Sequence, residues 1–344
     1  METRLTTLMD TKKIQTSVQE APSGPFVDYD VLIVGGGVAG FTSALFVARR
    51  GLKVAVISGE VGGQASAALI VDNYPGVQDI SGHNLVETMR TQATEAGATY
   101  IESVAQAIKK EESYFITSTT GEVIKSHAVV VACGKTPKPL GVPREDEFIH
   151  AGINYCQASQ LDEYKDKKVV VVGGGNSALG MAQAISSVAE SVAIIHRRDV
   201  FTAEATIVEQ VRSNSRIALI LNSMVTNIVG QDHITGLEVT TLNTNNTSEI
   251  MVDEVLVAVG FELKTDFVGS LIEKDATGQL LADTFGATKT PGLFAAGDCT
   301  NTPYKQMIVA AGQAASAGIT AAHYVATLTG RRLATLDWGQ QSKR

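Results

Sequence analysis

The sequence contains little of what marks several protein classes. It has three cysteines, one tryptophan and eight prolines in 344 residues. The cysteines, at positions 133, 156 and 299, form no close-spaced pair. This excludes a disulfide-stapled secreted scaffold and a cysteine-ligated metal site, and we predict no metal. No apolar run approaches the ~20 residues that a membrane helix needs, and no signal-peptide pattern is present. We therefore expect a cytoplasmic protein that does not bind a membrane.

Positive charge is also scarce. Lysine and arginine number 28 against 36 acidic residues, which gives a formal net charge of −8. No basic block interrupts this balance, so nucleic acid is not an expected partner. With 44% hydrophobic and 19% charged residues, the chain has the composition of an ordinary globular protein. Its length predicts two domains with ample cores.

Glycine is abundant, and it is arranged in a repeated pattern. Residues 31–40 read VLIVGGGVAG and residues 169–178 read VVVVGGGNSA. Each is an apolar run of the kind found in doubly buried strands, then G-x-G-x-x-G/A, then a helix-compatible segment. The first glycine permits the tight turn, the second lets backbone approach a pyrophosphate, and the third small residue lets the helix pack on the strand. The residues concerned are Gly35, Gly37 and Gly40 in the first copy and Gly173, Gly175, Asn176, Ser177 and Ala178 in the second. The pattern predicts two dinucleotide sites on Rossmann-like three-layer α/β domains.

The residues after the next strand distinguish the two sites. In the first copy this strand leads to Glu60, whose carboxylate suits a free ribose 2′-hydroxyl. In the second copy the equivalent strand leads to His196, Arg197 and Arg198. Two guanidiniums would bind a 2′-phosphate that a carboxylate would repel. The first site therefore suits FAD or NAD, and the second suits NADPH. The alternative is that both arginines are ordinary surface residues.

Further glycine-bearing loops lie near the first site in sequence. Gly63 and Gln64 follow the first βαβ unit, and Asn73 begins an NYPG turn. These loops either lie along an extended cofactor or are simple turns. Near the end of the chain, Gly297 and Asp298 form a strand-to-turn junction, followed by a small-residue-rich helix over about 308–327. We also expect a helix over 84–96, another over 203–212, and separate β-type runs over 122–125 and 128–131.

These motifs together resemble the low-molecular-weight thioredoxin reductase family of flavoproteins. The resemblance covers residues 30 to about 328 and rests on GGGVAG, GGQ, NYPG, ACGKTP (in place of the usual A-T-G), GGGNSA, HRRD and FAAGDCTNTPYKQ. It implies an FAD domain formed by residues 28–138 and 262–330, with an NAD(P)H domain, 139–261, inserted into it. Residues 1–27 and 331–344 would be tails. It also implies a homodimer, and it places Asp298 and the loop after it at the ribityl and pyrophosphate region of FAD, with Lys305 and Gln306 beside the isoalloxazine.

The departures from the family concern its redox centre. Relatives carry C-x-x-C followed by aspartate before the second glycine pattern, whereas this chain reads Cys156-Gln-Ala-Ser159-Gln160. A serine hydroxyl can neither form a disulfide nor act as the thiolate that attacks a flavin. We therefore expect the usual internal dithiol relay to be broken at Ser159. Cys156 either forms a mixed disulfide with a partner or is an idle thiol.

The other two cysteines and one further position complete the comparison with the family. Cys133 and Cys299 stand at small-residue positions beside the predicted FAD loops, and we interpret both as packing residues. Thr202 stands where relatives that bind NADPH often have another arginine. This predicts weaker discrimination against NADH.

Three functions remain open from the sequence. The first is an FAD-dependent NADPH oxidoreductase that resembles thioredoxin reductase, with hydride transfer from NADPH to FAD and on to a disulfide protein through Cys156 or external thiols. The second is a ferredoxin- or flavodoxin-NADP reductase, in which either the C-terminal tail with Trp338 covers the flavin, or Trp338 is a surface anchor or disordered. The third is a non-enzymatic, redox-sensing flavoprotein. For the first two, the partner would be a small redox protein of the thioredoxin, ferredoxin or flavodoxin type.

Overall fold

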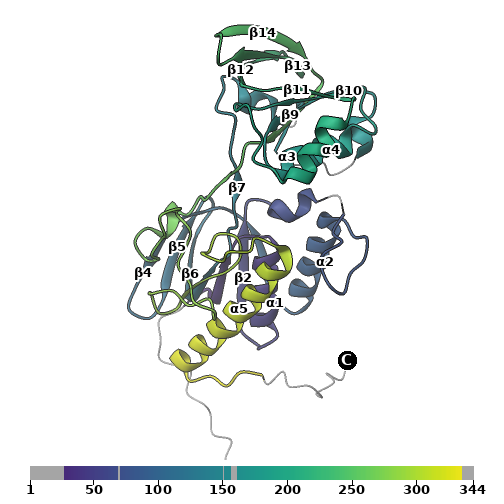
Figure 1. The fold of residues 1–344 in the computed structure, drawn as a ribbon. Helices are drawn as coiled ribbons and strands as arrows, with labels where there is room; N and C mark the ends of the chain where they lie inside the picture. The colour runs from purple at the N-terminus through teal and green to yellow at the C-terminus, as the bar shows by residue number, and fades with distance from the viewer. Residues whose placement is uncertain (1–26, 69, 150, 156–160, 335–344) are drawn as a thin grey trace, which may run out of the picture.

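The structure is a computed structural model that describes residues 27–68, 70–149, 151–155 and 161–334. Cys156, Ser159, Gln160 and Trp338 lie outside the described residues. The chain forms two α/β lobes, each built on its own sheet, and Figure 1 shows them one above the other. We refer to the lobe with the seven-stranded sheet as the first lobe and to the lobe with the five-stranded sheet as the second lobe.

The first lobe contains both ends of the described chain. Its strands follow the order β3-β2-β1-β6-β5-β4, and β17 pairs with β6 in parallel. β1, β2, β3, β6 and β17 run parallel, whereas β4, β5 and the start of β6 form an antiparallel ribbon. The elements are β1 (Tyr29–Val34), α1 (Val38–Ala48), β2 (Val54–Ser58), the 3-10 turn η1 (Gly63–Ala67), α2 (Gly82–Glu95), β3 (Thr99–Glu102), β4 (Ala105–Lys110), β5 (Phe115–Thr119), β6 (Val123–Val131), η4 (Asp266–Val268), β17 (Leu293–Ala295) and α5 (Met307–Thr329).

Alternation along β1 explains the layers of this lobe. Val31 and Ile33 belong to a core with α1, α2 and α5, whereas Leu32 and Val34 belong to a core on the other face of the sheet. All four are buried, as expected for a parallel strand that is covered on both sides. The small residues of α5 allow close approach to α1. A Cβ on Gly318 would lie only 2.7 Å from the carbonyl oxygen of Ser43.

The second lobe repeats this arrangement. Its sheet is fully parallel in the order β11-β10-β9-β15-β8, with α3 and α4 packed on one face. A three-stranded antiparallel sheet, β12-β13-β14, covers the other face. The elements are η2 (Glu145–Phe148), β8 (Ile153–Tyr155), η3 (Leu161–Tyr164), β9 (Lys168–Gly173), α3 (Asn176–Ile185), β10 (Ser191–Ile195), α4 (Ala205–Ser213), β11 (Ile217–Ile220), β12 (Ser223–Gly230), β13 (Ile234–Thr241), β14 (Asn246–Met251) and β15 (Glu254–Ala258).

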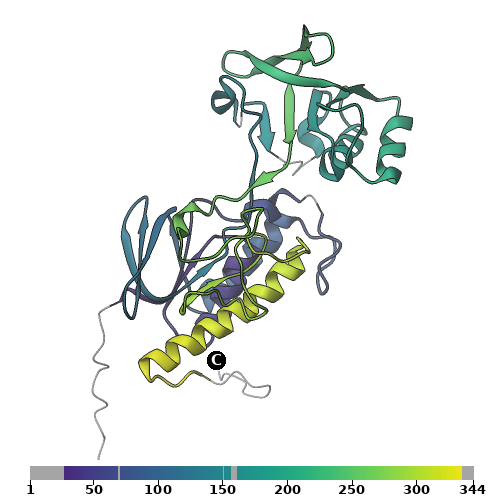
Figure 2. The same cartoon turned by 60° about the vertical axis from the view of Figure 1, so that its left-hand side comes forward.

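Two short strands connect the lobes. β7 (Thr136–Pro137) leaves the first lobe and pairs antiparallel with β16 (Phe261–Glu262), which returns to it. The fold is therefore α/β, with two Rossmann-like domains and the second inserted into the first. Figure 2 shows the two connecting segments side by side and α5 lying across the first lobe. Within the described residues, no helix is long and apolar enough to span a bilayer.

One expectation from the sequence needs correction. The runs 122–125 and 128–131 are a single strand, β6, and not two. The polar residues between them continue the strand because Ser126 pairs with Tyr29 on one side and with Phe115 on the other. His127 is buried as well, with its ring Nδ1 3.4 Å from the carbonyl oxygen of Ser113. Polar side chains thus interrupt the apolar pattern without interrupting the backbone ladder.

Candidate functional site

The first glycine loop joins β1 to α1 and has the geometry of a dinucleotide cradle. Gly35 has φ +121°, and a Cβ there would lie 2.3 Å from the carbonyl oxygen of Ala132. A Cβ on Gly40 would lie 1.8 Å from the carbonyl oxygen of Gly35, so this glycine permits the close contact of helix and loop. A Cβ on Gly37, by contrast, would meet only the carbonyl oxygen of Gly62, at 3.6 Å. Gly37 therefore faces open space.

The start of α1 is suited to bind an anion in that space. Gly37 is its N-cap, no side chain caps the helix, and the first turn contains no acidic residue. The first N–H groups of the helix are consequently free of side-chain acceptors and carry the positive end of the helix dipole. These features fit the pyrophosphate of a dinucleotide.

Glu60 lies next to this cradle, just beyond the end of β2. It is exposed, and its backbone carbonyl accepts a hydrogen bond of 2.6 Å from the Ser58 hydroxyl. The Gly62 N–H donates to the carbonyl of Gly36 at 2.8 Å, which holds the Glu60 loop against the glycine loop. The carboxylate is thus at the carboxyl edge of the sheet, where nucleotides bind in open α/β folds.

Two further loops from distant parts of the sequence come to the same edge. The Gln64 side-chain amide donates to the carbonyl of Lys135 at 3.0 Å, which links the Gly63-Gln64 loop to the end of β6. The Asn73 side-chain amide donates to Gln306, the N-cap of α5, at 3.2 Å. The structure therefore brings together the sequence-predicted residues of the GGQ, NYPG and YKQ motifs.

Asp298 lies at the centre of this edge, after β17. Burial raises the pKa of its carboxyl, while Lys135 and Lys305 oppose that rise. The Gly297 N–H is held by the Gln313 side chain at 3.1 Å. Lys305 is turned inward and donates to the carbonyls of Thr300, at 2.6 Å, and Asp298, at 3.2 Å. Lys305 thus organises the Asp298 loop.

The second glycine loop has the same design. Gly173 has φ +155°, and a Cβ there would lie 2.4 Å from the carbonyl oxygen of Ala258 and 2.9 Å from the Cβ of Ala178. A Cβ on Gly175 would meet only the Thr202 hydroxyl, at 3.9 Å. Gly175 is the N-cap of α3, which again has no side-chain cap and no acid in its first turn. A second pyrophosphate fits here.

The His196 ring packs against the backbone of this second loop at Gly174. A Cβ on Gly174 would lie 2.3 Å from the His196 ring, so only glycine permits the contact. The ring Nε2 lies 3.1 Å from the carbonyl oxygen of Val200, and the ring stacks on Phe201 at 5.5 Å between centroids. Burial lowers the pKa of His196, which favours the neutral imidazole at neutral pH. His196 therefore contributes packing and not charge.

The two arginines beside it point into solvent. Arg197 and Arg198 follow β10 and are exposed. Among the described residues, neither guanidinium forms an ion pair. Two unpaired guanidiniums at the carboxyl edge of the sheet fit a 2′-phosphate group.

Asn176 and Thr202 connect the second loop to the segment that follows the arginines. The Asn176 side chain accepts from the Glu204 N–H at 2.8 Å and donates to the Glu204 carboxylate at 2.9 Å. Thr202 donates to the carbonyl of Gly174 through both its N–H, at 2.8 Å, and its hydroxyl, at 3.1 Å. Ser177 is exposed at the start of α3.

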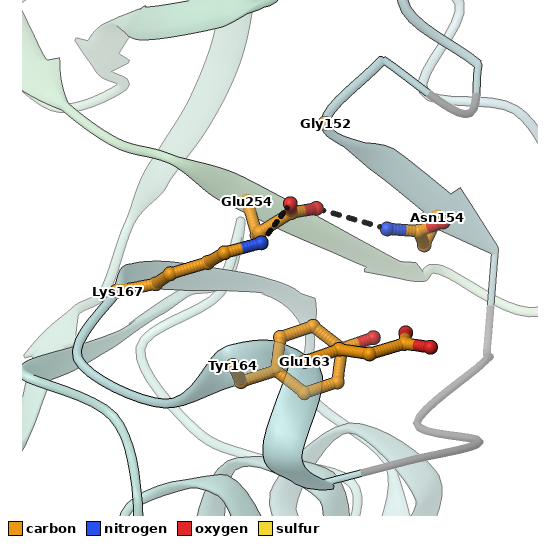
Figure 3. A pocket seen from close by; sticks show the side chains of 6 residues that line it. All are labelled: Gly152, Asn154, Glu163, Tyr164, Lys167 and Glu254. Atoms are coloured by element: carbon orange, nitrogen blue, oxygen red, sulfur yellow. Dashed lines mark hydrogen bonds and ion pairs between the residues drawn. The ribbon is translucent and has the colours of Figure 1, made fainter.

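A separate polar cavity lies at the opposite edge of the second lobe's sheet, where β8, β9 and β15 begin. Figure 3 shows the Glu254 carboxylate between Lys167, whose Nζ is 2.8 Å away, and the Asn154 amide, at 3.0 Å. Cofactors of open α/β sheets bind at the carboxyl ends of strands, and this carboxylate already has its partners. The cavity is therefore not the nucleotide site. No metal-binding cluster occurs within the part of the chain that the structure describes.

Sequence reasoning did not identify every residue of the site. Gln279 accepts a hydrogen bond from Lys305, and burial raises the pKa of Asp298 while the charge of Lys135 lowers it. The Glu204 carboxylate accepts a hydrogen bond from Asn176. The position of Lys135 in the loop that follows the buried strand β6 was a usable signal. Gln279 and Glu204 had none, because their roles depend on tertiary contacts. The predicted catalytic positions, Cys156 and Ser159, lie outside the described residues.

Comparison with known proteins agrees with this geometry. The family model described as "Pyridine nucleotide-disulphide oxidoreductase" matches residues 29–315. A thioredoxin reductase of Streptomyces clavuligerus is 35% identical over 304 residues, which cover 87% of this chain and 94% of that protein.

Solved structures give the same result. The thioredoxin reductase of Lactococcus lactis superposes with a TM-score of 0.75 at 28% identity, covering 87% of this chain and 99% of that one. For the enzyme of T. acidophilum the TM-score is 0.73 at 31% identity, with 86% and 98% covered. The chain therefore belongs to the pyridine nucleotide-disulphide oxidoreductases, and it is a thioredoxin reductase-like, FAD-dependent NAD(P)H oxidoreductase.

Proposed function

We propose that the protein oxidises NADPH at the second glycine loop, carries FAD at the first, and delivers electrons to a small redox protein without an internal dithiol. The observation that carries the proposal is the contrast between two cradles of the same geometry. The strand beside the first cradle is followed by an exposed carboxylate, Glu60, and the strand beside the second is followed by the exposed Arg197 and Arg198. Bound FAD would accept the hydride of NADPH and pass the electrons on.

The residues of the chain act by binding and orientation. The N–H groups at the starts of α1 and α3 hold the two pyrophosphates, and Glu60 accepts from a ribose hydroxyl. Arg197 and Arg198 neutralise the 2′-phosphate that distinguishes NADPH from NADH. Lys305 and Gln313 hold the backbone of the Asp298 loop at the carboxyl end of β17, from which the Asp298 carboxylate would contact FAD.

The acceptor depends on the segment Cys156-Gln-Ala-Ser159. Family relatives have the name thioredoxin reductase, which supports a thioredoxin-like protein or an external disulfide as the acceptor. Ser159 in place of a cysteine favours a second candidate, a ferredoxin- or flavodoxin-type partner, because that chemistry needs no protein dithiol. Assembly as a homodimer is part of the proposal.

Stopped-flow reduction followed by an acceptor panel tests this function. The FAD-loaded protein is mixed anaerobically with NADPH or NADH, and the reduced protein is then mixed with thioredoxin, ferredoxin, flavodoxin or a small disulfide. We expect faster flavin bleaching with NADPH at low concentration. We also expect rapid reoxidation by one class of acceptor. Bleaching at equal rates by both nucleotides would contradict the assignment of the second site.

A further inference from the structure

Two cysteine side chains that are far apart in sequence meet beneath the edge of the first site. Cys133 follows β6 and Cys299 follows β17, and these strands pair in parallel with Val131 opposite Ala295. The Cys299 Sγ lies 3.6 Å from the carbonyl oxygen of Val131 and 3.3 Å from that of Ala296. It thus reaches from the end of one strand to the end of the other. Cys133 packs against the buried cluster that contains Cys299, and a hydrogen-bond interaction between the two thiols shifts the pKa of both.

The two thiols differ in burial and in the direction of their pKa shifts. Cys299 is fully buried, whereas Cys133 is partly exposed. The hydrogen bond from Cys133, with the backbone N–H groups of Gly134 and Cys133, lowers the pKa of Cys299 in spite of its burial. The same hydrogen bond to Cys299, together with burial, raises the pKa of Cys133 well above its usual range. The surroundings therefore favour a thiolate on Cys299 over one on Cys133.

Three charged groups face the pair. Lys274 favours an anion at Cys133, and Asp298 disfavours one at Cys299. Lys305 is held beside Cys299 by the carbonyls of Asp298 and Thr300, and its charge favours a thiolate there. The positive charges of Lys274 and Lys305 outnumber the one carboxyl group, Asp298. The surroundings therefore stabilise one negative charge on the two cysteines.

The pair also touches both segments that form the first site. A Cβ on Gly35 would lie 3.0 Å from the Cys133 Cα, so the backbone of Cys133 packs on the first glycine of the cradle. Cys299 directly follows Asp298. The packing role predicted for both cysteines describes their burial, but packing alone requires no contact between the two thiols.

We propose that Cys133 and Cys299 form a reversible dithiol–disulfide pair that links the two sequence segments of the first lobe. The co-reactant is a small disulfide. The Cys133 sulfur attacks it and passes its proton to the Cys299 thiolate, and one thiolate leaves. That thiolate takes the proton from Cys299, whose sulfur then attacks the Cys133 sulfur and expels the second thiolate. Two protein thiols are oxidised, and one small disulfide is reduced to two thiols.

The test measures the cross-link directly. Full-length, FAD-loaded Cys156→Ser protein is equilibrated with mixtures of reduced and oxidised glutathione, quenched in acid, alkylated after denaturation and digested with trypsin. We expect peptides 126–135 and 290–305 to appear joined, two hydrogen masses lighter than their sum. Both thiols should be lost together, and dithiothreitol should restore them.

Two variants serve as controls. Cys133→Thr introduces the residue that the family resemblance gives at that position, and Cys299→Ala removes the buried sulfur. Each should abolish the cross-link and leave its remaining thiol open to alkylation, with FAD retained. The proposal is overturned if two alkylatable thiols persist at the oxidising end of the series, or if Cys133 stops at a glutathione adduct. The assay uses neither NADPH nor an acceptor, so its result is independent of the proposed function.

Discussion

Gly37 is the single residue at which we expect FAD binding to the first site to be most sensitive to a side chain. A Cβ at this position would meet only one protein atom, the carbonyl oxygen of Gly62, at 3.6 Å. We therefore expect Gly37→Val to fold normally and to lose FAD, because its side chain fills the space of the pyrophosphate. The measurement is the flavin-to-protein absorbance ratio after gel filtration. Gly180→Val, at an exposed helical glycine with nothing within 4 Å, is the matched control and should keep its flavin. Stoichiometric FAD in Gly37→Val would refute the assignment.

Arg197 and Arg198 are the residues on which we expect the nucleotide preference to depend. Charge-assisted hydrogen bonds to a phosphate are worth roughly 1.5–3 kcal/mol each, or about ten- to a hundredfold in affinity. Arg197→Ala/Arg198→Ala should therefore weaken the binding of NADPH strongly and the binding of NADH little, so that the preference for NADPH narrows or inverts. The ratio of the two half-saturating concentrations in flavin bleaching measures this. Arg212→Ala/Arg216→Ala removes the same charge near the opposite edge of the sheet and should keep the parent ratio. An unchanged ratio in the first variant would exclude the 2′-phosphate role.

At the scale of elements, local patterns predicted the parts of the fold that are locally encoded. The strand before His196, which the sequence predicts over 191–195, is β10 with the same bounds, and both strand–glycine–helix units occur where the apolar runs end at glycine. These units combine a buried strand, a positive-φ glycine and an uncapped helix start, all of which leave a local sequence signal. Between Arg212 and Val255 the sequence indicates only β-type segments without bounds, where the structure has strands β12–β14. Their pairing into a separate sheet depends on contacts with the buried face of β9 and β15, which no local pattern encodes.

The candidate site shows the same limit. Glycines and charged loop residues were identified, because their function requires a particular residue type. The partners that hold them, such as Gln279 for Lys305 and Glu204 for Asn176, come from distant loops. Strand β6 was read as two runs because Ser126 and His127 are buried polar residues, and burial of polar groups by pairing leaves no periodic signal.

The link between the lobes gives a prediction about an element. Glu145, in η2, is buried and accepts hydrogen bonds from the N–H groups of Leu140 and Gly141 at 2.7 and 2.8 Å. Its third partner is the Tyr155 hydroxyl, at 2.6 Å. Burial and this bond raise the pKa of Tyr155, which donates its proton to the carboxylate. Tyr155→Phe leaves the carboxylate short of one donor and should lower stability by about 1–3 kcal/mol.

Urea denaturation followed by circular dichroism checks this value. Tyr114→Phe is the control, since the aromatic ring of Tyr114 faces Lys125 at 5.9 Å and a phenyl ring keeps that contact. The free energies of unfolding of the two variants should differ by about 1 kcal/mol or more if Glu145 needs the Tyr155 hydroxyl as its third donor. Equal midpoints for both variants would show that the Glu145 carboxylate finds its third donor elsewhere.

At the scale of the whole molecule, each lobe has a glycine loop that we propose as a nucleotide site, and the chain between β8 and η3 contains the positions Cys156 and Ser159. Both proposed sites have a glycine loop followed by charged residues, whereas this segment reads Cys156-Gln-Ala-Ser159, in which we expect no dithiol. An enzyme of this kind is expected to take electrons from NADPH as its relatives do and to differ in how it passes them on. The number of electrons that the protein stores is therefore the property that separates the candidate functions.

Anaerobic titration with NADPH measures that number. Two proteins are compared, the Ser159 parent and the Ser159→Cys variant. Both also carry Cys133→Thr, so that Cys133 cannot pair with another cysteine.

The Ser159 parent should take up two electrons per FAD and should turn over thioredoxin very slowly, because a serine hydroxyl cannot form a disulfide. Ser159→Cys restores C-x-x-C. It should take up about four electrons and gain some disulfide reductase activity, limited by Gln160 in place of the aspartate of the family. Four-electron uptake by the Ser159 parent would mean that the broken relay is the wrong interpretation. Two-electron uptake by Ser159→Cys would mean that the segment between β8 and η3 does not deliver its cysteines to the flavin.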